Sequence, residues 1–256
     1  MNFTKSILAL IWLAAFFSCS NQTSIAQIQI RIPTIEQEAT SIWRTINDIE
    51  FLEQQGYRIH LPDHDVIQSL MAKSKAKQFG NEDFATIYNA LESGIYDKRK
   101  YDAALKKVQA QEALINTLIK RIKSEKESWD WPFQTFEPYD VVFTLYGTGG
   151  SYNPENGQVT LFTNEEGKFM NYENPINTIM HEIVHMGIEQ SIVQNYQLPH
   201  GLKERIVDKI TYLLFVDKIP DYKIQNMGDP KIDAYLTDKK DLKRLSSNIE
   251  RYQSEQ

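Results

Sequence analysis

The sequence predicts an α+β fold, in which a mainly helical N-terminal portion precedes a smaller domain with a β-hairpin and a pair of helices. Three patterns support this expectation. Apolar residues recur at helical spacing through most of residues 34–128, two short runs that follow are rich in β-branched residues, and two apolar segments of helical period come after them. The strand-like runs are 140–144 and 158–163, and the later helical segments lie at 174–189 and 202–216.

Residues 1–18 predict a targeting segment of the signal-peptide type. Lys5 provides the positive start, and the apolar run from Ser6 to Ser18 is too short to span a membrane. Cys19, the only cysteine of the chain, follows a sequence that resembles a lipoprotein box. The resemblance implies cleavage before Cys19 and attachment of lipid to its thiol and its new amino group. An ordinary signal peptide is the alternative.

The expected location is therefore the bacterial cell envelope, with the mature chain held at a membrane by its lipid anchor. Acidic residues, which mark surface export in some lipoproteins, are absent directly after Cys19, and this favours a periplasm-facing position.

The mature chain is expected to be acidic. Cleavage of the signal peptide would remove Lys5, and the net charge would change from −6 to −7. Nucleic acid is therefore not expected as a partner.

After the signal peptide, the sequence predicts three further parts. Residues 19–33 are expected to form a tether that ends in a short strand, because isoleucine alternates with polar residues from Ile28 to Ile32. A helical region is expected over 34–135, and the smaller domain over 136–256. Helices of the first region are predicted at 35–55, 66–77, 84–93 and 98–126.

Two histidines of this helical region have a spacing that metal ligands often have. His60 and His64 lie four residues apart, but Pro62 lies between them. Proline argues against a continuous helix there, so the two imidazole rings are not expected on one helical face. Both histidines are interpreted as loop residues.

The most specific pattern in the chain is His181-Glu182-Ile183-Val184-His185, an H-E-x-x-H sequence. Residues four apart share one face of a helix, so His181 and His185 can direct two imidazole rings at one metal ion. Glu182 lies beside that position and can take a proton from a water molecule and pass it to a leaving group. Asn174 as N-cap and Pro175 in the first turn predict the start of this helix. The pattern predicts a zinc site, with a packed or solvated histidine pair as the alternative.

A catalytic zinc site needs a third protein ligand and one open position. On the next helical segment, Glu204 and Asp208 lie four apart beside an apolar stripe. Glu204 can serve as the third ligand, and Asp208 can accept the free N–H of a ligating histidine. His200 is the second candidate for the third ligand. Glu189 is the third candidate. It lies about 12 Å from His181 along a helix axis, so one metal ion could not easily reach both residues.

The pairing of His181-Glu182-x-x-His185 with Glu204-x-x-x-Asp208 on the next helix resembles the gluzincins, the zinc peptidases that include thermolysin and the M1 aminopeptidases. The resemblance implies His181, His185 and Glu204 as zinc ligands, Glu182 as general base and acid, and Asp208 as an orienting carboxylate. It also implies a zincin-like fold for residues 136–256, with the two helices forming the active site.

The resemblance further points to a tyrosine that donates a hydrogen bond to the reaction intermediate. Tyr196 matches the spacing of such a tyrosine in thermolysin, and a packed tyrosine is the alternative. Tyr212, Tyr222 and Tyr235 are other candidates for this donor, and the sequence does not choose among them.

The expected function is zinc-dependent hydrolysis of peptide bonds in a peptide or protein substrate. In the gluzincins an edge strand binds extended peptide, which places the substrate beside residues 159–163 or 147–152. The alternative is a non-catalytic envelope lipoprotein, in which a structural or vestigial zinc site belongs to a binding or assembly module.

Overall fold

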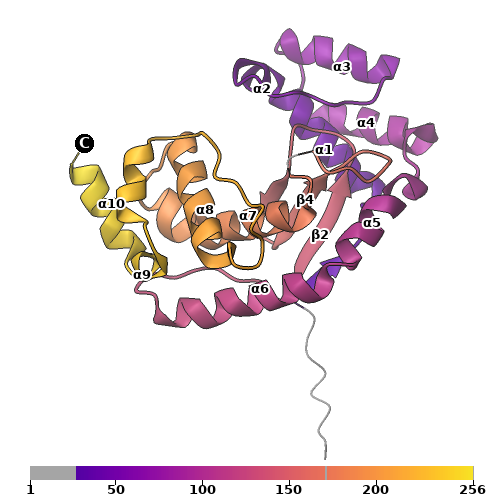
Figure 1. Ribbon diagram of the computed structural model, residues 1–256. Coiled ribbons are helices and arrows are strands. Elements are labelled where there is room, and N and C mark those ends of the chain that lie inside the picture. Colours follow the sequence, from indigo (N-terminus) through magenta and orange to yellow (C-terminus); the bar gives the residue numbers. More distant parts are fainter. Residues whose placement is uncertain (1–26, 171, 256) are drawn as a thin grey trace, which may run out of the picture.

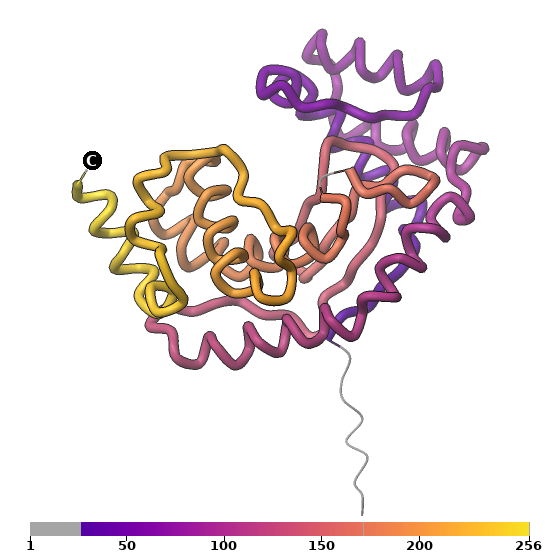
Figure 2. The backbone as a smooth tube through the Cα atoms, viewed as in Figure 1, coloured from indigo at the N-terminus to yellow at the C-terminus, as the bar shows by residue number. Residues whose placement is uncertain are grey.

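The computed structural model describes residues 27–170 and 172–255. The predicted signal peptide (1–18), the lipidation site Cys19 and the first part of the tether therefore lie outside the described residues. Within the described residues, no helix combines the length and the apolar character needed to cross a membrane. Helices surround one small sheet (Figures 1 and 2), so the α+β class expected from the sequence is confirmed in general terms.

The sheet has four strands in the order β1-β2-β4-β3. Strand β1 (Ile28–Ile30) confirms the short strand predicted from the isoleucine alternation. It pairs in parallel with β2 (Tyr139–Thr144), which also pairs in parallel with β4 (Gln158–Phe162). Strand β3 (Ser151–Asn153) pairs antiparallel with β4 and forms one edge of the sheet.

This topology corrects the expected hairpin. The two runs that the sequence indicated, now β2 and β4, are parallel neighbours, because the chain turns back between them as β3. The hairpin is β3–β4, and its turn contains Gly157 with a φ of +74°. A side chain at Gly157 would also overlap the ring of Phe136, so both the backbone conformation and the space favour glycine.

The N-terminal region is helical, as expected, but its helices are shorter. The expected helix 35–55 is interrupted at Asp48, whose backbone angles (φ −97°, ψ 11°) depart from those of an α-helix. The expected helix 98–126 is divided into two helices near Gln111. Each of the two helices buries its own apolar side chains in the core. The helices are α1 (Ile35–Asn47), α2 (Ile49–Gln54), α3 (Asp65–Lys75), α4 (Phe84–Ala90), α5 (Asp102–Gln109) and α6 (Glu112–Glu125).

Short turns of 3-10 or π type continue or join several of these helices. They lie at Asn81–Asp83, Leu91–Ile95, Lys98–Tyr101 and Lys126–Ser128. His60 and His64 lie in the loop between α2 and α3, which confirms their interpretation as loop residues. The ring of His64 accepts a hydrogen bond from the backbone N–H of Val66 (3.3 Å) and caps α3.

The C-terminal part contains the helix pair expected from the sequence. Helix α7 (Pro175–Ile188) starts where predicted, and the Asn174 side chain accepts a hydrogen bond from the N–H of Ile176 (3.3 Å). Every residue of α7 is buried, because β3, β4, α6 and α8 surround it. The remaining elements are a π turn (Glu189–Gln194), α8 (His200–Phe215), a 3-10 turn (Pro230–Tyr235), α9 (Lys239–Leu242) and α10 (Leu245–Ser254).

Two hydrophobic clusters hold these elements together. The larger joins the sheet to α5, α6, α7, α8 and α10, and the smaller joins α1, α3 and α4. In Figure 1, α6 runs along the lower side, beneath both the sheet and the C-terminal helices. Helices α5 and α6 thus share a core with residues that follow position 135. The division into domains 34–135 and 136–256 stays a prediction.

A buried carboxylate connects α1 to the sheet. Glu38 is fully buried, and it accepts hydrogen bonds from the hydroxyls of Tyr101 and Thr144 and from the N–H of Leu145 (2.9 Å). Burial raises the pKa of Glu38 to about 7, although these three donors oppose the rise. This junction helps to set the position of α1 and α2 relative to β2.

Candidate metal centre

Helices α7 and α8 bring together three side chains that were predicted as zinc ligands. The Nε2 atoms of His181 and His185 are 3.0 Å apart. The Oε2 atom of Glu204 lies 3.2 Å from Nε2 of His185 and 3.4 Å from Nε2 of His181. All three side chains are buried. Three potential ligand atoms therefore form a compact triangle.

The size of this triangle fits a small tetrahedral cation. Zinc binds histidine nitrogen and carboxylate oxygen at about 2.0–2.2 Å, and the ligand atoms of such a tetrahedron are about 3.3–3.5 Å apart. The three observed separations, 3.0, 3.2 and 3.4 Å, lie within a few tenths of an ångström of that value. Among residues 27–170 and 172–255, no other histidine or carboxylate joins this group. Two nitrogens, one oxygen and a free fourth position are the ligand set of a catalytic zinc.

The structure also separates the three candidates for the third ligand. Glu204 contributes to the triangle, whereas Glu189 accepts hydrogen bonds from Tyr152 (2.8 Å) and Gln194 (3.0 Å) and is not part of it. His200 lies near the other oxygen of Glu204, with 3.7 Å between its Nδ1 and Oε1. It is more exposed than the three clustered residues.

Asp208 lies where it can orient His181. Its Oδ1 atom is 3.2 Å from Nδ1 of His181, and its Oδ2 atom accepts a hydrogen bond from the N–H of Gln225 (2.7 Å). The hydroxyl of Tyr222 lies 2.8 Å from the same Nδ1 and donates to Oδ1 of Asp208 (2.6 Å). Nδ1 can therefore act as a donor toward both oxygens, which leaves the lone pair of Nε2 for a metal ion. Tyr222 was only one of several tyrosine candidates in the sequence.

His185 is held in a different way. Its Nδ1 atom is buried and has no hydrogen-bond partner among the described residues. Its ring stacks on the ring of Tyr152, with 4.9 Å between centroids and 9° between planes. Sequence reasoning missed Tyr152, because no signal in the sequence shows that the short strand β3 crosses over α7.

The charges of the cluster favour a cation at its centre. Burial raises the pKa of Glu204, but its hydrogen bonds with His181 and His185 outweigh this effect and hold that pKa well below its usual range. Burial lowers the pKa of His181, yet the hydrogen bonds to Asp208 and Glu204 raise it to about 10. Burial brings the pKa of His185 down to about 4. Glu204 thus keeps a negative charge beside the two imidazole rings, and a metal ion bound there would displace a proton from the cluster.

Glu182 follows His181 on α7 and faces the loop that leads into β3. It is buried, and burial raises the pKa of its carboxyl group to about 7. The loop passes so close that a Cβ atom at Gly150 would lie 2.8 Å from Oε1 of Glu182 and 2.6 Å from Thr178. Glycine is therefore required where the loop crosses this carboxyl group. Glu182 can both accept and release a proton near neutral pH.

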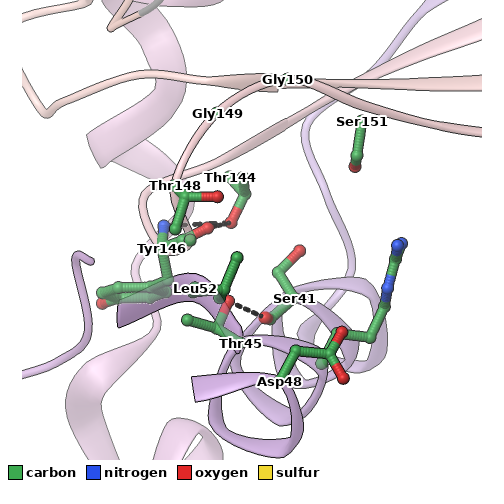
Figure 3. Close-up of a pocket in the computed structure, with 12 residues that line it drawn as sticks. Ser41, Thr45, Asp48, Leu52, Thr144, Tyr146, Thr148, Gly149, Gly150 and Ser151 are labelled. Carbon is green, nitrogen blue, oxygen red and sulfur yellow. Dashed lines mark hydrogen bonds between the residues drawn. The ribbon is translucent and has the colours of Figure 1, made fainter. Parts of the chain in front are cut away.

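A cavity of about 520 Å³ opens beside these residues. Besides the clustered side chains, its lining includes residues of α1 and α2, which sequence reasoning did not connect with the site. It adjoins a smaller cavity of about 120 Å³ behind the glycine-rich loop, shown in Figure 3. Both cavities are lined by Arg44, Leu52, Thr148, Gly149, Gly150 and Ser151.

The structure does not bring Tyr196 to this cavity, which corrects the expectation from spacing. After α7 the chain makes a π turn and directs Tyr196 toward α10, where its hydroxyl donates to Glu250 (2.9 Å). Tyr235 likewise bonds to Glu255 on the outside of the molecule. Tyr212 is 36% exposed and does not line the cavity.

Comparison with protein-family models, with curated proteins and with solved structures finds no match for this chain. The case for a metal centre therefore depends on the side chains, distances and burial described above. Two of the three clustered side chains are the histidines of the H-E-x-x-H motif, and the fold adds Glu204 to them.

Proposed function

We propose that this protein is a peptidase that hydrolyses peptide bonds with a zinc ion held by His181, His185 and Glu204. The observation that carries the proposal is the buried triangle of ligand atoms, whose dimensions fit zinc, in the same cavity as Glu182. A zinc ion bound there would polarise a substrate carbonyl and lower the pKa of a water molecule. In this proposal α7 and α8 are the active-site helices of a zincin-like domain.

Glu182 is proposed as the group that moves the proton. Its carboxylate takes a proton from the attacking water and then passes it to the nitrogen of the leaving amine. A pKa of about 7 suits both steps, because neither protonation state is strongly disfavoured at neutral pH. The backbone of Gly150 passes close to this carboxyl group, where a larger residue would collide with it.

Tyr57 is proposed as the donor that stabilises the negative oxygen formed during attack. Two tyrosines line the cavity, and the hydroxyl of one of them, Tyr152, already donates to Glu189. The hydroxyl of Tyr57 makes no hydrogen bond with a described residue. Tyr57 lines the same cavity as Glu204, and burial together with the charge of Glu204 raises its pKa. The proposal therefore takes this donor from the helical N-terminal part of the chain.

The substrate is proposed to bind along β3. Strand β4 is paired on both sides, by β2 and by β3, so residues 159–163 have no free edge for a peptide. Strand β3 has only one partner, and residues 149–152 line the cavity. An extended peptide can add to this edge by main-chain hydrogen bonds. The peptide would then pass above Glu182.

The lipid anchor on Cys19 and the position at an envelope membrane remain part of the proposal. They are supported by the apolar run and the cysteine that follows it. A peptidase anchored in this way would act on peptides or proteins close to the membrane surface.

Metal content and peptide cleavage, measured on one set of variants, test the proposal. We expect the purified chain to bind one zinc by elemental analysis and to cleave members of a peptide library. Glu204→Ala should lose the zinc, whereas Glu182→Gln should keep it and lose hydrolysis. Glu189→Gln is the matched control, because this carboxylate lies in the same cavity but outside the triangle, and it should keep the zinc.

Two results would contradict the proposal in different ways. A folded chain that binds no zinc would remove the metal centre altogether. Zinc that is bound in the wild type without any cleavage, and with no difference between wild type and Glu182→Gln, would favour a structural site in a binding module.

A further inference from the structure

A separate cavity lies at the carboxyl ends of the two central strands of the sheet. Its volume is about 360 Å³, and it shares no lining residue with the cavity that contains His181 and Glu204. Strands β2 and β4 are parallel and end at Thr144 and Phe162, so the loops that follow them start at the same edge of the sheet. In open sheets of parallel strands, ligands bind outside the carboxyl ends of the strands. A cavity of this size can hold a small organic molecule.

One part of this cavity is apolar. Leu145 follows β2, Phe162 ends β4, and Met170 returns to the same place after a tight turn. Asn164 fixes this turn, because its side chain accepts a hydrogen bond from the N–H of Lys168 (2.8 Å). The N–H of Met170 then donates to the carbonyl of Phe162 (3.1 Å). Met170 is 36% exposed although it is a large hydrophobic residue, so apolar surface stays open to a ligand here.

Another part of the cavity carries a positive charge without a balancing carboxylate. Arg58 lines the cavity and is exposed, and its guanidinium forms no ion pair with another described residue. Glu165 is the only carboxylate among the described residues that line the cavity, and it pairs with Lys100 (2.8 Å), which lies outside the lining. The charges around this cavity therefore favour an anion over a cation.

His60 adds an uncharged hydrogen-bonding group to the lining. Its ring packs against the ring of Phe162, with 5.2 Å between centroids and 62° between planes. Burial and the charge of Arg58 lower the pKa of His60, so its imidazole is neutral at pH 7. The backbone of His60 bonds to Gly147, whereas its ring nitrogens make no hydrogen bond with a described residue. A neutral imidazole has one donor and one acceptor, and its N–H can therefore serve an oxygen of a ligand.

We propose that this cavity binds a small organic anion with an apolar body, such as an aromatic or aliphatic carboxylate or sulfonate. The acidic group of the ligand pairs with Arg58 and the N–H of His60, and its apolar body covers Met170 and Phe162. Charge-assisted hydrogen bonds to arginine are stronger than neutral ones, and removal of apolar surface from water adds to the binding. The inference does not depend on the proposed peptidase function, because no residue of the candidate metal centre lines this cavity.

Two fluorescent probes with the same aromatic body test the need for a negative charge. Anilinonaphthalene sulfonate carries an anionic group, and phenylnaphthylamine lacks it. We expect Arg58→Gln to weaken binding of the sulfonate probe to the purified chain by about fivefold and to leave binding of the neutral probe unchanged. Met170→Ala should weaken binding of both probes by about fivefold.

Arg44→Gln is the matched control for the charge. Arg44 is also exposed and forms no ion pair with another described residue, but it lines the other two cavities. Its replacement should change the affinity for neither probe. Equal thermal midpoints would show that the variants fold alike.

Methyl NMR of the chain with labelled methionine locates the bound probe. The signal of Met170 should shift when the sulfonate probe is added, and the signal of Met227, which lines the cavity at the candidate metal centre, should not. The spectra of Met170→Ala and Met227→Ala assign the two signals. A shift of Met227 without a shift of Met170 would overturn the inference, and so would the absence of sulfonate binding. Equal effects of Arg58→Gln on both probes, or no effect on either, would overturn it as well.

Discussion

The buried carboxyl group of Glu38 gives the protein a pH dependence of stability with a defined sign. Its pKa rises from 4.5 to about 7 on folding, because burial disfavours the charged form. Between these pH values the folded chain keeps a proton that the unfolded chain has released. The free energy of unfolding therefore falls as pH rises from about 4.5 to about 7, and this contribution is constant above that range.

The size of this effect follows from the shift itself. A rise of roughly 2.5 pH units corresponds to about 3 kcal/mol of differential stability at 1.36 kcal/mol per unit. Glu38→Gln removes the ionisation and keeps a similar shape, so its stability should lack this decline. The difference in the free energy of unfolding between wild type and Glu38→Gln should therefore change by about 3 kcal/mol, in favour of the variant, between about pH 4.5 and about pH 8.

Urea unfolding of both proteins, followed by circular dichroism at several pH values, measures this difference. Other titrating groups cancel when the two proteins are compared at the same pH. Glu36→Gln is a control on the same helix, because the Glu36 side chain is exposed and its replacement should give a curve parallel to the wild type. Parallel curves for Glu38→Gln would refute the reasoning, since they would mean that Glu38 does not hold its proton more tightly in the folded protein.

Three further predictions concern the candidate site and its support. Asp208→Ala should weaken zinc binding 10- to 100-fold, measured by competition with a chelator, because His181 loses a hydrogen-bond acceptor; unchanged affinity would contradict the orienting role. Tyr57→Phe should lower kcat about 100-fold with little change in zinc content, whereas Tyr212→Phe should be neutral; equal activity of both would exclude Tyr57 as the donor. Gly187→Ala should lower the free energy of unfolding by about 1–3 kcal/mol, because the added carbon would overlap the ring of Phe133; a thermal midpoint equal to that of the wild type would contradict this packing.

The helix pair and the clustered residues on it could be predicted because the information is local. Histidines four apart share a helical face wherever the helix lies, and Asn174-Pro175 marks its first turn. Glu204 and Asp208 follow on the next helix with the same spacing. The sequence does not indicate how closely the two helices approach each other, and this distance is known only from the structure.

The rest of the site could not be predicted, because it is assembled from segments distant in the sequence. Tyr152 reaches His185 only because β3 crosses α7, and a three-residue strand has too little pattern to predict its partner. Phe51 and Tyr57 look like ordinary residues of a short amphipathic helix and its loop until α2 is placed beside the cavity. Tyr196 shows the reverse case, in which spacing alone suggested a role that the π turn after α7 prevents.

The loop over Glu182 is fastened to the N-terminal half of the chain. The backbone N–H and carbonyl of Gly147 exchange hydrogen bonds with those of His60 (2.8 and 2.9 Å). The cavity therefore has walls from residues 44–57, 148–154 and 181–227, and none of these segments encloses it alone. The cleft is therefore complete only when these three segments have folded together, so the proposed site exists in the folded chain and not in any one of its segments.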